Sequence, residues 1–264
     1  MTNQVTGTAL ITGASSGIGA TYADRLARRG HDLVLVARSA GKLEALADRL
    51  RKETGVKVET LPADLGKADD LRKVEQRLRG DAGITILVNN AGIVGDGPLA
   101  SADPDKLEAM IQVNVIATTR LASAIFPRLL AADAGAIINI SSVTALMSGA
   151  FEPGYGATKA YLLNFTEALK AEAGSSKVRI QAVLPGITRT AIWEGPHAKL
   201  DLVPAEMVMD VNEMVDASLA GFDQGEVVTI PSLPDAGDWD DYVAAREALA
   251  PNLSHAKAAT RYGL

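Results

Sequence analysis

Two side chains that can move a proton together stand one helical turn apart in this sequence. Tyr155 and Lys159 are separated by four positions, which places them on the same face of a helix. A phenol has an unperturbed pKa of about 10 and ionises little at neutral pH, whereas a nearby ammonium group favours the phenolate. Such a pair is common by chance, so its meaning depends on the elements around it.

A glycine-rich turn stands between a predicted strand (8–12) and a predicted helix (17–29). The first glycine permits a tight turn, the second lets the backbone approach a pyrophosphate, and the third lets the helix pack closely on the sheet. The start of the helix offers free N–H groups and the positive end of its dipole to phosphates. A glycine turn alone can be structural, but in this context it predicts a dinucleotide cofactor. The predicted contacts are Gly13, Ser15, Ser16, Gly17, Ile18 and Gly19.

The next predicted strand, over residues 33–37, ends in Ala37 and is followed by Arg38. An NAD site usually has an acidic side chain at this place to hold the adenine ribose hydroxyls, and Ala37 provides none. A guanidinium group can grip the 2′-phosphate of NADP with its planar fork, so we predict NADP(H) as the cofactor. The alternative is that Arg38 is a solvated surface charge. After the third strand, Asp64 and Leu65 are expected to frame the adenine ring.

These motifs lie on a repeated alternation of short apolar strands and longer helices. Continuous apolar strands indicate burial on both faces, and β-α-β units with right-handed crossovers give a parallel sheet. We therefore predict an α/β fold of Rossmann type: a doubly wound, seven-stranded, mainly parallel sheet with helices on both faces. The chain would form a single domain over 1–264, with a C-terminal tail at about 232–264. The predicted strands are 8–12, 33–37, 56–61, 84–89, 136–141, 178–184 and 226–230, and the predicted helices are 17–29, 42–53, 67–78, 104–130, 155–172 and 239–249.

The order and spacing of these motifs together resemble the short-chain dehydrogenase/reductase family in its single-domain form. The resemblance runs from about Thr8 to Thr190, with a weaker match to the last strand. It implies an oxidoreductase that transfers a hydride between a nicotinamide and a carbonyl or secondary alcohol. Besides the glycine turn, it rests on Asn89-Asn90-Ala91-Gly92, Asn114, Ser141-Ser142, Tyr155-x-x-x-Lys159 and Pro185-Gly186.

The resemblance implies a role for each matching residue. Tyr155 would be the general acid/base, and Lys159 would lower its pKa and bind the nicotinamide ribose. Ser142 would hold and polarise the substrate oxygen, with Ser141 the less favoured candidate. Asn114 would fix a water molecule that links Lys159 to solvent; the alternative is that it is a satisfied buried amide. Further cofactor contacts are implied at Asn90, Ala91, Gly92, Pro185, Gly186, Thr188 and Thr190.

The substrate side of the predicted site is mostly apolar. Each of its side chains alone can be an ordinary loop anchor, but together they favour a small to medium hydrophobic ketone or aldehyde over a sugar phosphate. Glu152, which stands among them, is interpreted as a surface charge. The predicted substrate contacts are Ser142, Leu146, Met147, Phe151 and Trp193, the last in an irregular insertion over 191–204.

Two other functions are compatible with the same motifs. An epimerase or dehydratase can use this scaffold, although the lack of a longer C-terminal substrate domain weighs against it. A regulator that senses NADP(H) without turnover is the other alternative, and the intact Ser-Tyr-Lys set weighs against that.

Composition argues against several further kinds of site. The chain has 264 residues, of which 47% are hydrophobic, and a formal net charge of -6, which gives no electrostatic reason to expect nucleic acid or an anionic membrane as a partner. Because it has no cysteine and its three histidines are far apart in sequence, we expect no disulfide and no metal site. The N-terminus lacks a secretory pattern, so we expect a cytoplasmic protein. Its partners would be a small-molecule substrate and copies of itself, in a homodimer or homotetramer.

Overall fold

The computed structural model describes residues 6–95, 97–149, 152–190, 200 and 203–264. Its contacts divide the chain into two compact units, Met1–Pro231 and Ser232–Leu264, called here the body and the tail. The division falls where the sequence predicts the start of a tail. All residues predicted for the site belong to the body.

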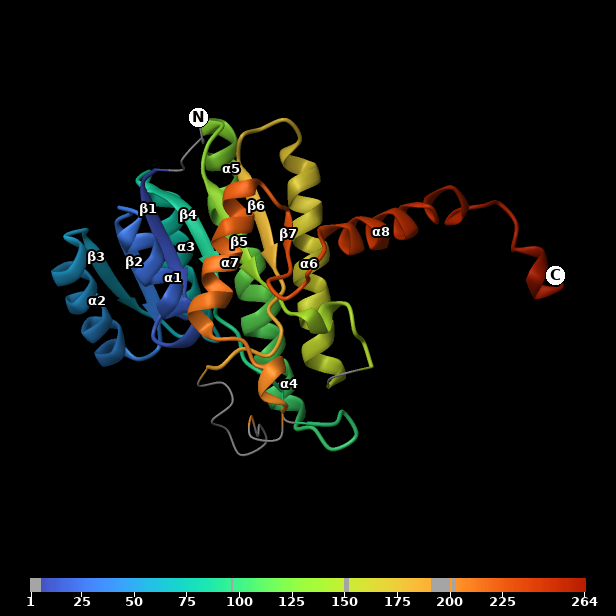
Figure 1. Ribbon diagram of the computed structural model, residues 1–264, viewed down its shortest axis with the longest axis horizontal. Coiled ribbons are helices and arrows are strands. Elements are labelled where there is room, and N and C mark those ends of the chain that lie inside the picture. The colour runs from blue at the N-terminus through green and yellow to red at the C-terminus, as the bar shows by residue number, and fades with distance from the viewer. Residues whose placement is uncertain (1–5, 96, 150–151, 191–199, 201–202) are drawn as a thin grey trace. The chain divides into compact units, whose positions relative to one another are not determined.

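The body is built on a parallel sheet (Figure 1). In the part of the chain that the structure describes, seven strands pair in the order β3-β2-β1-β4-β5-β6-β7, and every pairing is parallel. The chain begins in the middle with β1, runs outward to β3 and crosses back to β4, so a topological switch point lies between β1 and β4. Ligands bind at such a point, outside the carboxyl ends of the strands. The strands are β1 (Thr8–Thr12), β2 (Leu33–Ala37), β3 (Val58–Pro62), β4 (Ile84–Asn89), β5 (Ala136–Ile140), β6 (Arg179–Val183) and β7 (Val228–Thr229).

Helices cover both faces of this sheet (Figure 1). Apolar side chains of α1, α2 and α7 form one buried cluster with the strands, and those of α3, α5 and the end of α6 form a second cluster. Central strands are apolar on both sides for this reason, and all five residues of β2 are buried. The predicted fold class is confirmed. The helices are α1 (Gly17–Arg28), α2 (Ala40–Thr54), α3 (Ala68–Gly80), α4 (Pro104–Ile111), α5 (Thr118–Ala132), α6 (Pro153–Ala173), α7 (Val211–Gln224) and α8 (Ala236–Glu247).

The helix predicted over 104–130 is not one regular α-helix. α4 begins after Asp103, whose side chain caps it, and the chain then forms a π-helical turn, η1 (Gln112–Ala117), before it continues as α5. The wider turn contains Asn114, whose side chain is hydrogen-bonded to a different segment of the chain. Single π-helical turns inside α-helices are frequent at functional sites.

Most other predicted elements differ from the structure only at their ends, and α7 is a helix for which the sequence analysis gives no bounds. β3 runs from 58 to 62 instead of 56 to 61, and β7 has two residues because it pairs with β6 only at Ala182 and Val183. α8 begins at Ala236 because the carboxylate of Asp235 accepts a hydrogen bond from the Gly237 N–H. α6 begins two residues earlier than predicted, which places Tyr155 in its first turn.

One helical stretch of the described chain could cross a membrane by length and composition alone. It is Pro104–Ala132, whose most apolar window has a mean hydropathy of 1.3. Half of that window is buried inside the protein, and α5 packs against α3 and β4. A helix buried in the core of a folded protein can be equally apolar, so this stretch is weak evidence for a membrane span.

Candidate active site

The glycine-rich turn between β1 and α1 packs against the end of β4. Asn90 donates hydrogen bonds from its side-chain amide to the carbonyl oxygens of Thr12 and Gly13, at 2.9 and 3.3 Å. The Thr12 hydroxyl in turn accepts hydrogen bonds from the N–H groups of Asn90 and Ala91, both at 3.0 Å. Two of the predicted cofactor segments are therefore held together at the switch point of the sheet.

The three glycines of the turn meet different constraints. Gly13 and Gly17 have φ values of 65° and 52°, in the left-handed region that favours glycine. A Cβ on Gly19 would overlap the carbonyl oxygen of Gly13, so only glycine lets α1 approach the turn this closely. An added Cβ on Gly17 would lie 3.3 Å from Thr190, so the segment that follows β6 reaches the same place.

The start of α1 has the character of a phosphate site. Ser16 is the N-cap residue, but its side chain makes no capping hydrogen bond, and no acidic residue stands in the first turn. Ser15 and Ile18 are partly exposed beside it. The positive end of the helix dipole and its free N–H groups can therefore act on an anion, so this turn fits the pyrophosphate of a dinucleotide.

The segment after β6 borders the site. The carbonyl oxygen of Pro185 accepts a hydrogen bond from the Val143 N–H at 3.1 Å, which ties it to the segment after β5. Thr188 is 4% exposed, its hydroxyl donates to the carbonyl oxygen of Gly186 at 3.1 Å, and its backbone forms a parallel bridge with Met209. This segment is therefore firmly held by the body.

Ser142, Tyr155 and Lys159 come together after β5 and in the first turns of α6. The Ser142 hydroxyl hydrogen-bonds to the phenol of Tyr155. The Lys159 ammonium lies 5.5 Å from the centroid of the Tyr155 ring and donates a hydrogen bond to the carbonyl oxygen of Ile140 at 2.9 Å. Ser141 instead donates its hydroxyl proton to the Lys159 carbonyl oxygen at 2.7 Å, away from the phenol. The geometry thus favours Ser142 over Ser141 as the residue that holds a substrate oxygen.

Asn114 lies beside this group and is fully buried. Its side chain accepts a hydrogen bond from the Ile93 N–H and donates to the Ile93 carbonyl oxygen, both at 2.9 Å, and it also donates to the Thr158 hydroxyl at 3.1 Å. A Cβ on Gly92 would lie 3.3 Å from the Asn114 side-chain oxygen and 3.6 Å from the Lys159 nitrogen. Asn114 is thus a satisfied buried amide that also adjoins Lys159.

Burial dominates the titration of both groups in the pair. Burial raises the pKa of Tyr155 to about 12, the hydrogen bond with Ser142 acts to lower it, and the charge of Glu152 raises it. Burial lowers the pKa of Lys159 to about 8. The expected lowering of the Tyr155 pKa by Lys159 is not found, because loss of solvation outweighs the other influences and the ammonium is hydrogen-bonded to Ile140.

The carboxyl end of β2 is open to solvent. Arg38 is exposed and makes no hydrogen bond or ion pair to the described part of the chain. The Ala63 N–H donates to the Ala37 carbonyl oxygen at 3.0 Å, so the end of β3 lies beside the end of β2. This brings Asp64 and the buried Leu65 to the same edge of the sheet as Arg38, as the sequence-based model requires.

Residues 7–200 match the family model described as short chain dehydrogenase. The chain belongs to the short-chain dehydrogenase family. Two curated relatives are very-long-chain 3-oxoacyl-CoA reductase-B of Danio rerio, 33% identical over 202 residues, and 17-beta-hydroxysteroid dehydrogenase type 3 of Homo sapiens, 35% identical over 187 residues. The matches cover 75% and 70% of this chain but 65% and 60% of those proteins, so the chain spans about two thirds or less of their length.

Solved structures of similar proteins match nearly the whole of this short-chain dehydrogenase. A short-chain dehydrogenase from Sphingobium yanoikuyae in complex with NADPH is 50% identical, with a TM-score of 0.93, and the match covers 96% of this chain and 98% of that one. A bulky-bulky ketone specific alcohol dehydrogenase from Comamonas testosteroni is 45% identical, with a TM-score of 0.90 and coverage of 97% and 98%. The chain is thus an oxidoreductase of the class that acts on CH–OH and C=O groups.

The structure of this short-chain dehydrogenase describes only part of the predicted substrate surface. Leu146 is half-buried and Met147 is 57% exposed after Ser142. Phe151 and Trp193 lie outside the described residues.

Glu152 was missed by sequence reasoning, which interprets it as a surface charge. It is half-buried, and its carboxylate accepts hydrogen bonds from the N–H groups of Gly95 and Gly97. These partners are more than fifty positions away in sequence, so no local pattern indicates the contact.

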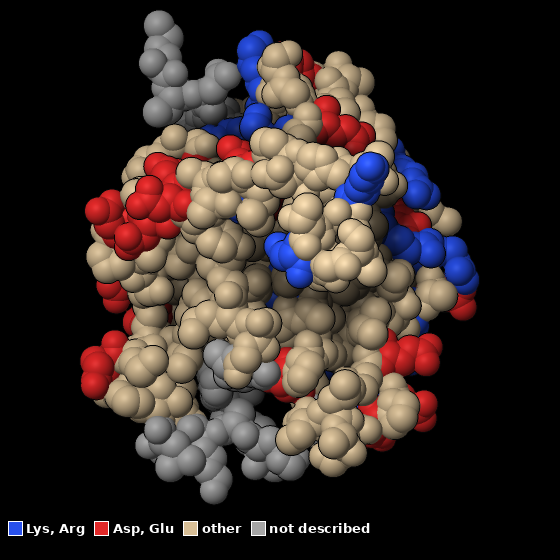
Figure 2. All heavy atoms as spheres, turned by 90° about the vertical axis from the view of Figure 1, so that its right-hand side faces the viewer, with Lys and Arg blue, Asp and Glu red and all other residues tan. Residues whose placement is uncertain are grey.

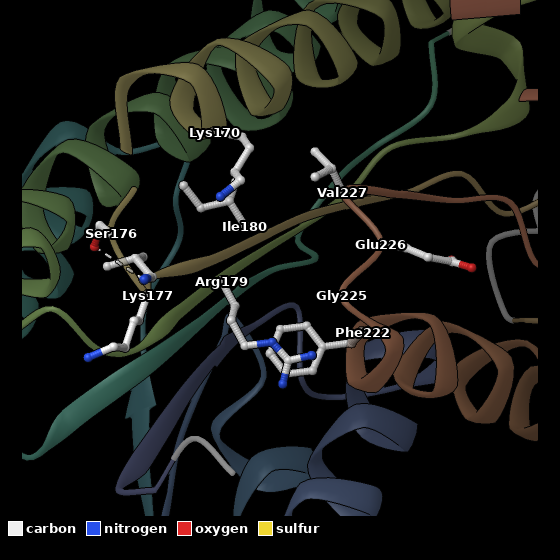
Figure 3. A pocket seen from close by; sticks show the side chains of 10 residues that line it. Lys170, Ser176, Lys177, Arg179, Ile180, Phe222, Gly225, Glu226 and Val227 are labelled. Atoms are coloured by element: carbon white, nitrogen blue, oxygen red, sulfur yellow. Dashed lines mark hydrogen bonds between the residues drawn. The ribbon is translucent and has the colours of Figure 1, made fainter. Parts of the chain in front are cut away.

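A pocket at the other edge of the sheet contains none of the predicted site residues. Its lining comes from the amino end of β6 and from the segments around the ends of α6 and α7, as Figure 3 shows. There the Arg179 guanidinium lies over the Phe222 ring, 3.8 Å from its centroid (Figure 3). Because ligands of such sheets bind at the carboxyl ends of the strands, this pocket is not the candidate active site.

Proposed function

We propose that this short-chain dehydrogenase is an NADP(H)-dependent reductase of hydrophobic ketones or aldehydes. The observation that carries the proposal is the convergence of Ser142, Tyr155 and Lys159 beside Gly92, at the sheet edge where the glycine turn lies. When bound there, the nicotinamide supplies the hydride that reaches the carbonyl carbon. The chain itself supplies the proton and the means to align the reactants.

The protonation states of the pair suit the reducing direction. With a pKa raised to about 12, the Tyr155 phenol keeps its proton at neutral pH and can donate it to the substrate oxygen. Lys159, with a pKa of about 8, is then mostly cationic and favours the phenolate that remains. The Ser142 hydroxyl, already bonded to the phenol, would hold the substrate oxygen within reach. Positioned acid catalysis of this kind contributes about 10²- to 10⁴-fold to a rate.

Arg38 supports NADP(H) as the cofactor. Its exposed guanidinium has no partner in the described chain and is free to turn toward a 2′-phosphate at the end of β2. Ala37 offers no carboxylate to the ribose hydroxyls of NAD. The complex of the similar Sphingobium protein with NADPH agrees with this choice.

The substrate class follows from the apolar side chains after Ser142. Leu146 and Met147 add no charge to that surface, and a hydrophobic ketone can bury its substituents against them. The similar Comamonas protein is specific for bulky-bulky ketones, which suggests ketones that carry a large group on each side.

A turnover screen tests this function. NADPH oxidation would be followed with aldehydes, ketones with one small substituent and ketones with two large ones, and NADP reduction with the matching alcohols. We expect turnover of ketones, with NADPH favoured over NADH. No turnover in either direction by a folded protein that binds NADPH would contradict the proposal.

We further propose a cytoplasmic homodimer or homotetramer. Apolar side chains are exposed on α4, η1 and α6, where Ile111, Ile116 and Tyr161 are 47%, 39% and 38% exposed. Figure 2 shows Lys, Arg, Asp and Glu side chains spread among uncharged residues over one side of the molecule. Exposed apolar surface of this kind commonly becomes an interface between copies. A monomeric mass by light scattering at micromolar concentration would contradict this assembly.

A further inference from the structure

The carboxylate of Glu152 joins two segments that border the candidate active site: the loop after Gly92 and the start of α6. Glu152 precedes the first residue of α6 and stands three positions before Tyr155. One carboxylate oxygen accepts a hydrogen bond from the Gly95 N–H at 2.9 Å, and the other accepts one from the Gly97 N–H at 3.3 Å. Both donors belong to the loop that continues from Gly92, next to Asn114 and Lys159. A single side chain thus connects this loop to the start of the catalytic helix.

The loop is shaped for this contact. A Cβ on Gly95 would overlap the Glu152 carboxylate, so an added methyl group there would displace the carboxylate from its present position. Gly97 has a φ of 100°, in the region that favours glycine. The two glycines let one short loop present both N–H groups to the same carboxylate, whereas a solvated surface charge would place no such demand on the loop.

Glu152 does not use its carboxylate to cap its own helix. It is the N-cap residue of α6, yet its side chain makes no capping hydrogen bond. The side chain is turned to the loop, and its charge still acts on the phenol. The groups that face Tyr155 include the Ser142 hydroxyl by a hydrogen bond, the Lys159 ammonium beside the ring, and the negative charge of Glu152.

We propose that Glu152 is a positioning residue: by tying the loop after Gly92 to the start of α6, it fixes the wall of the substrate site relative to the Tyr155 phenol. This rests on the proposed ketone reduction, whose acid is Tyr155. Glu152 acts through the loop and through its charge, without contact to the reacting atoms. The charge makes the phenol hold its proton more tightly, which suits an acid that must stay protonated until the carbonyl is reduced.

Two substitutions distinguish the effect of the hydrogen bonds between Glu152 and the loop from the effect of the negative charge of Glu152. Glu152→Asp keeps the charge but is one methylene shorter, so it cannot reach both N–H groups. Glu152→Gln keeps the length but loses the charge and one of the two acceptors. Glu172→Gln removes the same charge from an exposed position near the far end of α6 and is the matched control.

The expected effects on kinetics differ between Glu152→Asp and Glu152→Gln. Glu152→Asp should raise the ketone KM by roughly 5- to 30-fold, while the Kd of NADPH stays within about twofold, because only the substrate wall moves. Glu152→Gln should also lower the pH midpoint of alcohol oxidation by about 0.5 to 1 unit, because a negative charge near the phenol is gone. Glu172→Gln should change neither. If both Glu152 variants match that control in KM and in pH midpoint, the proposal is overturned.

A second variant tests the contact from the side of the loop. Gly95→Ala displaces the Glu152 carboxylate from the loop and should raise the ketone KM about as much as Glu152→Asp does. The double variant should show no further increase, because both changes break the same connection. Fully additive effects would overturn the proposal. Thermal unfolding of each variant shows whether it is folded.

Amide exchange separates failure of this proposal from failure of the proposed function. The Gly95 and Gly97 N–H groups should exchange with solvent deuterium faster in Glu152→Asp than in the parent or in Glu172→Gln. That result supports the connection even if the parent reduces no ketone. Unchanged exchange at both amides overturns it whatever the activity.

Discussion

The candidate catalytic cluster and the carboxyl end of β2 lie at the same edge of the sheet but differ in how the protein holds their side chains. In the cluster, Asn114 and Lys159 are 0% and 5% exposed, and their polar atoms are bonded to Ile93, Thr158 and Ile140. At the end of β2, Arg38 is exposed and has no partner in the described chain.

This difference separates two kinds of functional group. The cluster is organised before any ligand binds, which is the condition under which fixed dipoles and charges act most strongly on a reaction. Arg38 must be ordered by the ligand, and immobilising a long side chain costs about 0.5 to 1.5 kcal/mol of its interaction. We therefore expect large effects on rate from the cluster and a more modest effect on cofactor choice from Arg38.

The largest expected effect is that of Tyr155→Phe, which keeps the ring and removes the proton donor. Turnover should fall by about 10²- to 10⁴-fold, because the substrate oxygen loses its acid. The Kd of NADPH should stay close to that of the parent. Tyr161→Phe, which makes the same change on the same helix, is the control and should keep nearly full activity. A Tyr155→Phe enzyme with more than a few per cent of parent turnover would show that another group donates the proton.

The next effect is on cofactor choice, through Ala37 and Arg38. A 2′-phosphate that meets Arg38 gains a charge-assisted interaction weakened by solvent, so we expect NADPH to be preferred by roughly 10- to 1000-fold. Ala37→Asp together with Arg38→Ala should reverse this preference, because the carboxylate accepts the ribose hydroxyls and repels the phosphate. The measurement is the ratio of kcat/KM for NADPH and NADH. Lys52→Ala, which removes an exposed charge from α2, is the control. A parent enzyme that prefers NADH would show that Arg38 points only to solvent.

A smaller effect is expected from pH. Tyr155 stays protonated through the neutral range, whereas Lys159, with its pKa lowered to about 8, loses its charge as the pH rises through that value. The phenolate formed on proton donation then loses its stabilising cation. We expect kcat/KM for ketone reduction to fall by about tenfold between about pH 7 and pH 9. The Kd of NADPH at each pH serves as the control, and a flat profile over this range would contradict the assigned role of Lys159.

Much of this site could be predicted from sequence because it depends on local patterns. The glycine turn needs left-handed or closely packed backbone at Gly13, Gly17 and Gly19, and few other residues allow this. Tyr155 and Lys159 lie on one face of α6 because they are one helical turn apart, and Arg38 is the residue that comes directly after the last residue of β2. Continuous apolar strands likewise predicted the parallel sheet.

What the sequence could not predict depends on contacts between distant segments. The π-helical turn at Asn114 accompanies hydrogen bonds to Ile93. The hydrophobic periodicity of residues 104–130 predicts neither the turn nor these hydrogen bonds. Glu152 looks like a surface charge until the loop with Gly95 and Gly97 folds against it. The pKa of Tyr155 was expected to fall because a lysine is near, but it rises because burial outweighs that influence. The direction of this pKa shift depends on how far the phenol is removed from solvent, which the spacing of Tyr155 and Lys159 does not indicate.

The last prediction concerns stability. It tests directly whether the catalytic cluster is held more firmly by the protein than the carboxyl end of β2. Asn114→Ala would leave the Ile93 N–H and carbonyl groups and the Thr158 hydroxyl without their partner, at a cost of about 2 to 4 kcal/mol. In a domain of this size that lowers the melting temperature by roughly 5 to 15 °C. Arg38→Ala removes an exposed side chain without a described partner and should change it by no more than about 2 °C. Both melting temperatures are measured on the cofactor-free protein by thermal unfolding.

NADPH should then raise the melting temperature of the parent more than that of Arg38→Ala, because ligand stabilisation follows affinity. Equal loss of stability in the two variants would mean that Arg38 is held by the body, and that the carboxyl end of β2 is as fully organised as the cluster.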